Sequence, residues 1–130
     1  MTVLVDTNVL VRHLTQDSPE LGPRATLLLF TSDQLHLPDV IFAETIYVLQ
    51  SVYAATRERI AQSMRSVLGI ASIEAEHPKL LVRALDVYEG QRVDFADAYL
   101  VALAEASGIR TIASFDRSLD RIETVNRVEP

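Results

Sequence analysis

Cysteine is absent from the 130-residue chain, and lysine is almost absent. Without cysteine there are no disulfides, no thiolate metal sites and no cysteine nucleophile. No apolar run approaches the ~20 residues that a membrane-spanning helix needs. An acidic residue, Asp6, comes too early for the apolar region of a signal peptide. The default expectation is therefore a soluble cytoplasmic protein with no membrane association.

Positive charge is also scarce, because 12 basic residues face 18 acidic ones and the net charge is −6. Only Lys79 is a lysine; the other basic residues are arginines. A chain this acidic is a poor candidate for tight electrostatic binding of nucleic acid over a broad face. An enzyme that handles nucleic acid through bound cations is still compatible with it, and a basic protein partner is favoured.

The length and the 48% hydrophobic content are those of one globular domain, residues 1–130. Short β-branched runs alternate with one or two helical segments, which predicts parallel strands joined by helical crossovers, with helices on both faces of the sheet. Strands are expected at 2–5, 35–37, 70–73, 111–114 and 124–128. Helices are expected at 8–14, 20–30, 40–53, 57–68, 77–90 and 94–108.

Ligands of such sheets bind outside the carboxyl ends of the strands. Asp6 directly follows the first predicted strand, and Asp116 lies two residues past the fourth. Ser114, the last residue of the fourth strand, brings a hydroxyl to the same edge. Each aspartate also has a structural interpretation, since either can cap the helix or turn that follows it.

Two further carboxylates lie in apolar helices. Glu44 is surrounded by apolar residues in "VIFAETIYVL", a segment expected to be buried on nearly all sides. Asp94 and Asp97 open "DFADAYLVALA", three residues apart. Capping explains Asp94 well and Asp97 only in part, so Asp97 is the stronger site candidate. The alternative for Glu44 is a narrow exposed stripe beside Thr45.

Taken together, these acids predict a cation site. Two come from strand ends and two from helices, so a covered parallel sheet is expected to bring Asp6, Glu44, Asp97 and Asp116 to one edge. Like charges at close range disfavour one another's ionised forms unless a cation neutralises them. An all-oxygen donor set favours Mg²⁺ or Mn²⁺.

The segments "VLVDTNVLVR", "PDVIFAETIYVL", "DFADAYLVALAEASG" and "TIASFDRSL" resemble, in this order, the motifs of the PIN-domain family and its VapC-like toxins. The resemblance implies a three-layer α/β/α sandwich with a central parallel sheet of four to five strands. It also implies a metal-dependent endoribonuclease that forms a homodimer and is inhibited by a small antitoxin protein. The implied acidic metal site consists of Asp6, Glu44, Asp97 and Asp116.

The same resemblance assigns accessory roles to three residues. Asp94 is an additional acid in some relatives, and Asn8 of "DTN" is expected to orient the site. Ser114 takes the place of a threonine in many family members and keeps its hydroxyl.

The expected function is thus a Mg²⁺- or Mn²⁺-dependent endoribonuclease acting on RNA as the toxin of a toxin–antitoxin pair. The alternatives are an aspartyl-nucleophile phosphohydrolase, in which Asp6 attacks phosphorus, and a catalytically silent PIN-like binding module. The phosphohydrolase pattern needs an aspartate where Asn8 stands. A metal-independent ribonuclease needs a histidine acid and base, and His13, His36 and His77 fall in unrelated segments.

Overall fold

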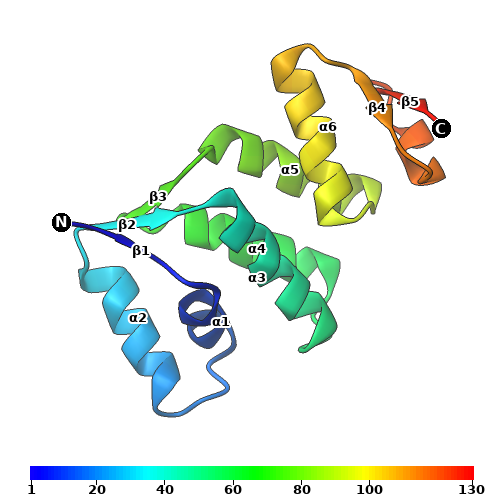
Figure 1. Cartoon of the computed structure of the whole chain (residues 1–130). Helices are drawn as coiled ribbons and strands as arrows, with labels where there is room; N and C mark the ends of the chain where they lie inside the picture. The colour runs from blue at the N-terminus through cyan, green and yellow to red at the C-terminus, as the bar shows by residue number, and fades with distance from the viewer. The chain divides into compact units, whose positions relative to one another are not determined.

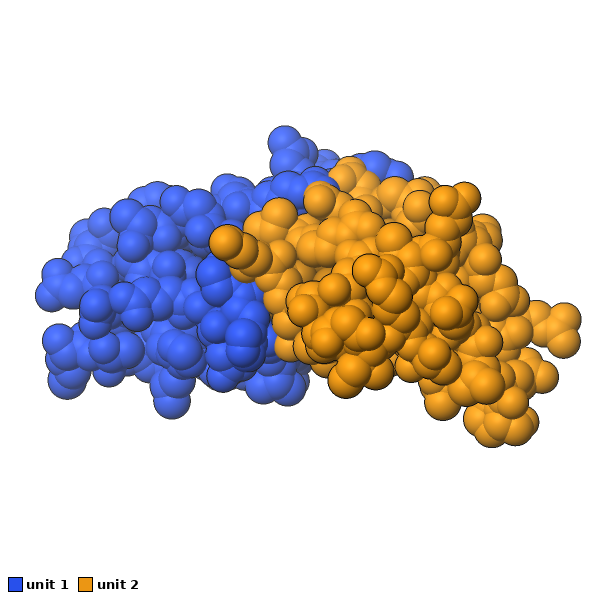
Figure 2. Space-filling view, turned by 90° about the horizontal axis from the view of Figure 1, so that it is seen from above, with its two compact units in different colours: residues 1–78 blue, residues 79–130 orange.

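The computed structural model of the chain describes residues 1–130, which form two compact units (Figures 1 and 2). Unit 1 is Met1–Pro78 and unit 2 is Lys79–Pro130. Unit 1 contains β1 (Thr2–Leu4), α1 (Thr7–Thr15), α2 (Leu21–Thr31), β2 (Gln34–Leu37), α3 (Asp39–Ser51), α4 (Arg57–Leu68) and β3 (Ile73–Ala75). Unit 2 contains α5 (Pro78–Gln91, whose first residue ends unit 1), α6 (Phe95–Ser107), β4 (Thr111–Ala113), the 3₁₀ helix η1 (Arg117–Arg121) and β5 (Asn126–Val128).

The strands of unit 1 form a three-stranded parallel sheet in the order β1-β2-β3. In its register Val3 lies opposite Leu35, and Leu35 lies opposite Ile73. β1 is an edge strand of this sheet, and its side chains Val3 and Leu4 are 41% and 70% exposed. In the central strand β2 both apolar side chains, Leu35 and Leu37, are buried.

Helices fill both connections between these strands. Connections between parallel strands are right-handed. The connections from β1 to β2 and from β2 to β3 step in the same direction across the sheet, so their helices lie on the same face. Accordingly α1 packs against α2 and α3, and α3 packs against α4. The core between them includes Leu10, Leu29, Leu35 and Phe42, each no more than 1% exposed.

Unit 2 places two helices before a parallel pair of strands, β4 and β5, in which Ile112 lies opposite Arg127. Gly108 ends α6 with a φ of 77°, a left-handed conformation that glycine adopts without steric cost and that the sequence predicts here. The 3₁₀ helix η1 connects the two strands and packs against β5. Its residue Leu119 is fully buried.

The predicted α/β fold, with parallel strands flanked by helices, is confirmed. All five expected strands are present, and every pairing is parallel. The hydrogen-bonded pairing is three plus two, one sheet in each unit.

Several predicted boundaries are shifted by one to three residues, and two of these shifts have a local physical cause. The strand expected at 70–73 begins only at Ile73, because Gly69 to Ser72 turn after α4 and the Ile73 amide donates to the Ile70 carbonyl at 3.0 Å. The helix expected to stop at Gly90 continues to Gln91, and the left-handed residue that ends it is Arg92, at φ 55°. No helix is long and apolar enough to cross a membrane.

Candidate active site: two groups of carboxylates

The first group lies in unit 1, where β1 leads into α1. Asp6 is the N-cap of α1, and its Oδ1 accepts a hydrogen bond from the Thr7 amide at 2.8 Å. The capping interpretation of Asp6 is therefore correct in the structure. It does not remove Asp6 as a metal ligand, because the side chain is exposed and only Oδ1 is engaged.

Glu44 belongs to the same group. It lies on α3, and its Oε1 accepts a hydrogen bond from the Thr7 hydroxyl. The expectation that this helix is buried on nearly all sides is wrong: Glu44 is exposed, and Val40 and Tyr47 on the same stripe are 71% and 68% exposed. The helix is long and apolar, but Phe42, Thr45, Ile46 and Leu49 alone are buried.

Thr7 contacts both acids of unit 1, and the sequence analysis did not single it out. It is only 6% exposed, and its two donors contact both acids of unit 1, the amide with Asp6 and the hydroxyl with Glu44. A signal was available, because a threonine between a strand-end aspartate and an apolar helix can donate hydrogen bonds as well as cap the helix. The "DTN" motif drew attention to Asn8 instead.

The second group lies in unit 2 and consists of Asp94, Asp97 and Asp116. One carboxylate oxygen from each lies within 4.8 Å of the others. Asp94 is at the N-cap position of α6, but its side chain makes no capping hydrogen bond. Asp97 is in the first turn of the same helix, and Asp116 precedes η1.

The titration behaviour of this group follows from its crowding. Burial, the hydrogen bond with Asp116 and the charges of Asp116 and Asp94 raise the pKa of Asp97 to about 6. Hydrogen bonds from the Ser118 hydroxyl and amide, together with the one from Asp97, lower the pKa of Asp116. Below about pH 6 and in the absence of a cation, the proton shared by these two acids therefore resides on Asp97, which donates it to Asp116.

The accessory residues differ in how directly they meet the acids. The Ser114 hydroxyl accepts a hydrogen bond from the Asp116 amide at 3.0 Å, so it shapes the turn that presents Asp116. Asn8 is exposed and lines a groove of about 420 Å³ between α1 and α2, together with Arg12 and Leu28. Its role as a site-orienting residue stays a prediction.

The residues of unit 2 fit a small divalent cation. All donors are carboxylate oxygens, the type that Mg²⁺ and Mn²⁺ prefer. Ligands on opposite sides of Mg²⁺ lie about 4 Å apart, twice the metal–oxygen distance, and the oxygens of this group lie within 4.8 Å of one another. The proton held by Asp97 also marks a place where positive charge is favoured.

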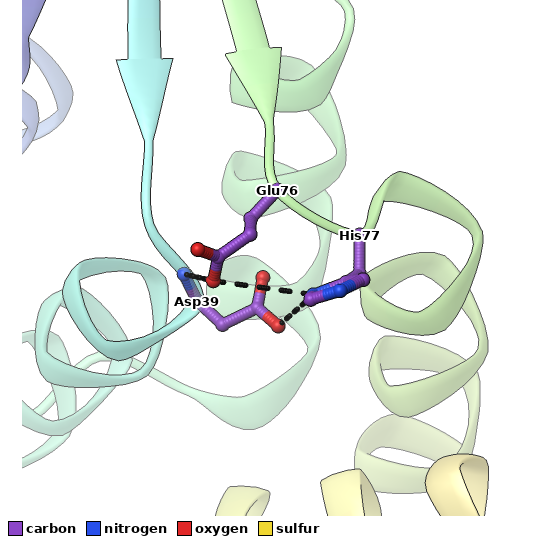
Figure 3. A group of neighbouring side chains, drawn as sticks. All are labelled: Asp39, Glu76 and His77. Atoms are coloured by element: carbon purple, nitrogen blue, oxygen red, sulfur yellow. Dashed lines mark hydrogen bonds and ion pairs between the residues drawn. The ribbon is translucent and has the colours of Figure 1, made fainter.

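Unit 1 also contains a group of two acids and a histidine, Asp39, Glu76 and His77 (Figure 3). Its contacts have a structural explanation. Asp39 starts α3, and its amide donates to Glu76 Oε1 at 3.3 Å. His77 Nδ1 lies 2.8 Å from Asp39 Oδ2 and 3.9 Å from Glu76 Oε1. These contacts tie the first turn of α3 to the segment that follows β3, and we interpret the group as a structural junction.

Both groups of acids lie in the part of the chain that matches a single protein family. Residues 3–125, a span that includes every predicted site residue, match the PIN domain family. The chain belongs to the PIN-domain family. The predicted resemblance is thereby confirmed, and this PIN-domain chain is similar along nearly its whole length to one curated relative.

That relative is a VapC ribonuclease of Aquifex aeolicus (strain VF5), 24% identical over 131 residues that cover 97% of each chain. Among solved structures, this PIN-domain chain is similar to one described as VapBC2 from Rickettsia felis bound to a DNA fragment from their promoter. The identity there is 14%, the TM-score is 0.40, and the match covers 99% of this chain and 98% of the other.

Proposed function

We propose that this PIN-domain protein is a Mg²⁺- or Mn²⁺-dependent endoribonuclease and the toxin of a toxin–antitoxin pair. The observation that carries the metal dependence is the group of three carboxylates in unit 2, whose oxygens lie within 4.8 Å and in which Asp97 retains a proton at an unusually high pH. The similarity to a VapC ribonuclease over 97% of the chain supports RNA as the substrate class.

The proposed metal ligands and catalytic residues are Asp6 and Glu44 of unit 1 and Asp97 and Asp116 of unit 2, with Asp94 as an accessory acid. The family match supports this choice because it runs through both units without interruption. For the same reason we propose that residues 1–130 act as one PIN-like domain.

Asp6, Glu44, Asp97 and Asp116 would hold the cation, which would supply activation of a water molecule and neutralisation of the charge on the phosphodiester. The protein prepares the ligands. Thr7 holds Asp6 and Glu44 through hydrogen bonds, and Ser118 holds Asp116. Asp97 gives up its proton when the cation binds, so cation binding is expected to release protons below about pH 6.

RNA cleavage by the purified protein tests the proposal. Cleavage is expected with Mg²⁺ or Mn²⁺ and is expected to stop with EDTA. Asp6→Asn and Asp97→Asn are each expected to reduce the rate by more than about 100-fold, since losing a ligand costs at least as much as losing a partner of a ligand. Asp33→Asn, which changes an exposed acid outside both groups, is the matched control.

The result that contradicts the proposal is a folded Asp97→Asn protein that cleaves RNA at the wild-type rate. A phospho-aspartate formed on Asp6 from a phosphate ester would instead support the phosphohydrolase alternative. Metal binding without any RNA cleavage would support a silent binding module.

We also propose a homodimer and a cognate antitoxin as partners. The net charge of −6 favours a basic partner segment. Helix α2 exposes Leu27 and Phe30 at 64% and 63%, which is apolar surface available to a protein partner. The molar mass in solution, measured by light scattering with and without the protein of a neighbouring gene, tests both partners.

A further inference from the structure

Three polar residues are buried in the structure, namely Thr7, Thr45 and Ser72, and one of them is bonded unlike the others. The hydroxyls of Thr45 and Ser72 donate to main-chain carbonyls, those of Ile41 and Leu29. Such bonds satisfy the buried hydroxyl and require nothing more. The Thr7 hydroxyl instead donates to a carboxylate on another helix, Glu44 Oε1.

The main-chain amide of Thr7 reaches the other acid of unit 1. It donates to Asp6 Oδ1 at 2.8 Å, while the hydroxyl engages Glu44, 37 residues away in sequence. We propose that Thr7 is a positioning residue that fixes the Glu44 carboxylate relative to Asp6 for cation binding. The inference rests on the proposed function and adds the residue that sets the relation between two of its ligands.

The physical reason is preorganisation. Glu44 is exposed and carries three rotatable side-chain bonds, so without a partner its carboxylate samples many positions. Thr7 is buried in the first turn of a helix, and the packing around it limits the directions in which its hydroxyl can point. A fixed donor holds Glu44 in place before the cation arrives, and the cation then binds without first ordering that side chain.

Because of this hydrogen bond, the two carboxylate oxygens of Glu44 have different roles in the proposal. Oε1 accepts the proton of the Thr7 hydroxyl, a charge-assisted hydrogen bond. Oε2 is left for a cation or for a water bound to it. Partners that orient ligands in this way typically change metal affinity by about 10–100-fold when removed.

Binding of Mn²⁺ alone to the full-length protein tests the inference by calorimetry, with no RNA present. Thr7→Val keeps the shape and removes the donor, and we expect Mn²⁺ affinity about 10-fold weaker. Thr7→Ser keeps the donor and is expected to stay within about 3-fold of wild type. Thr45→Val is the matched control, a buried threonine of the same unit that contacts no acid, and wild-type affinity is expected.

RNA cleavage gives a second measurement. The Mn²⁺ concentration for half-maximal cleavage is expected to rise in Thr7→Val by the same factor as the dissociation constant, with the rate at saturating Mn²⁺ changed less. Thr7→Val in a Glu44→Ala background is expected to cause no further loss, because the threonine acts through that carboxylate and alanine leaves no acceptor for its hydroxyl.

Wild-type Mn²⁺ affinity in Thr7→Val overturns the inference and leaves the proposed function standing. Loss of affinity in Thr7→Ser as large as in Thr7→Val also overturns it, since packing of the methyl group would then be the cause. If Thr7→Val does not fold, Thr7→Ala removes the donor without pressing a methyl group on Glu44, and the same criteria apply. A wild-type protein that neither binds Mn²⁺ nor cleaves RNA overturns both proposals.

Discussion

The two units of this protein hold their carboxylates in opposite ways. In unit 1, Asp6 and Glu44 each face a donor, the amide and the hydroxyl of Thr7. In unit 2, Asp94, Asp97 and Asp116 face one another, and the crowding raises the pKa of Asp97 to about 6. The same type of side chain is therefore supported by the fold in one unit and opposed by its neighbours in the other.

This difference separates two ways of preparing a cation site. Unit 1 uses hydrogen bonds to order its ligands, and removal of an acid there removes a favourable contact. Unit 2 keeps like charges close together, and removal of Asp97 there relieves repulsion. A divalent cation is expected to stabilise unit 2 more than unit 1, because only unit 2 has an unfavourable interaction for the cation to relieve.

The largest expected effect concerns whether the two units unfold together. Phe42→Ala removes a fully buried ring from α3 and is expected to lower the free energy of unfolding by about 3–5 kcal/mol. If residues 1–130 form one domain, amide hydrogen exchange in α6 accelerates along with that in α3. Phe30→Ala, at a side chain 63% exposed, is the control and is expected to change stability by less than ~0.5 kcal/mol. Unchanged exchange in α6 would contradict the single domain.

The next effect sharpens the contrast between the two groups of acids. In metal-free protein at pH 7, Asp6→Ala is expected to lower stability by about 0.5–1 kcal/mol, because α1 loses its N-cap. Asp97→Asn is expected to raise stability, because it removes a charge from the crowded group. The pKa of Asp97 is raised by about two units, which corresponds to roughly 3 kcal/mol for a fully buried group. Solvent screening at this partly exposed position reduces that free energy to about 1 kcal/mol.

Urea denaturation monitored by circular dichroism measures both changes. Asp6→Asn, which keeps a capping side chain, is the control for Asp6→Ala. If Asp97→Asn lowers stability in the absence of metal, the claim that crowded charges destabilise unit 2 is contradicted.

The contrast also predicts a pH dependence. The pKa of Asp97 is raised on folding from 3.8 to about 6, so between these values the folded protein binds more protons than the unfolded chain. Stability attributable to Asp97 is therefore present below about pH 4 and is lost as the pH rises through 6. Asp116 acts in the opposite direction, because its pKa is lowered and its contribution is lost as the pH falls.

The difference between wild type and Asp97→Asn isolates the effect of Asp97. We expect the stability gained by Asp97→Asn to grow between pH 4 and pH 7 in EDTA, measured by thermal unfolding at each pH. Saturating Mg²⁺ is expected to abolish this gain. A difference that does not vary with pH would contradict the raised pKa.

How much of this was predictable from sequence depended on how local each signal is. Helix capping and left-handed glycine act within one turn of the chain. For this reason the sequence predicts the start of α4 after its N-cap Thr56 and the end of α6 at Gly108. The start of β3 was missed, since Ile70 and Ile73 are both buried and only the pairing with Leu35 decides which residues form the strand.

The site followed the same rule. Asp94, Asp97 and Asp116 were identified, and their proximity within unit 2 is present in the structure. Thr7 was missed because its importance depends on Glu44, which is far away in sequence and reached only through the packing of α1 against α3. Sequence pattern identifies acids that are out of place more readily than the neutral residues that hold them.

The smallest expected effect lies at the junction of Asp39, Glu76 and His77. His77→Ala removes the contact between Asp39 and an imidazole that is 58% exposed, and where that imidazole is protonated a loss below about 1 kcal/mol is expected. The loss is expected to shrink in 1 M salt, where charges on the surface are screened. A larger, salt-independent loss in thermal unfolding would show that the junction contributes more to unit 1 than its exposure indicates.

The edge position of β1 has a practical consequence. Its outer side carries no strand of the three-stranded sheet, and Leu4, the last residue of the strand, is 70% exposed. An open strand edge beside apolar side chains is a template on which another polypeptide adds a strand. A truncated product that ends near Pro78 would therefore tend to polymerise through this edge, and attempts to study the first unit by itself will need a solubilising change there.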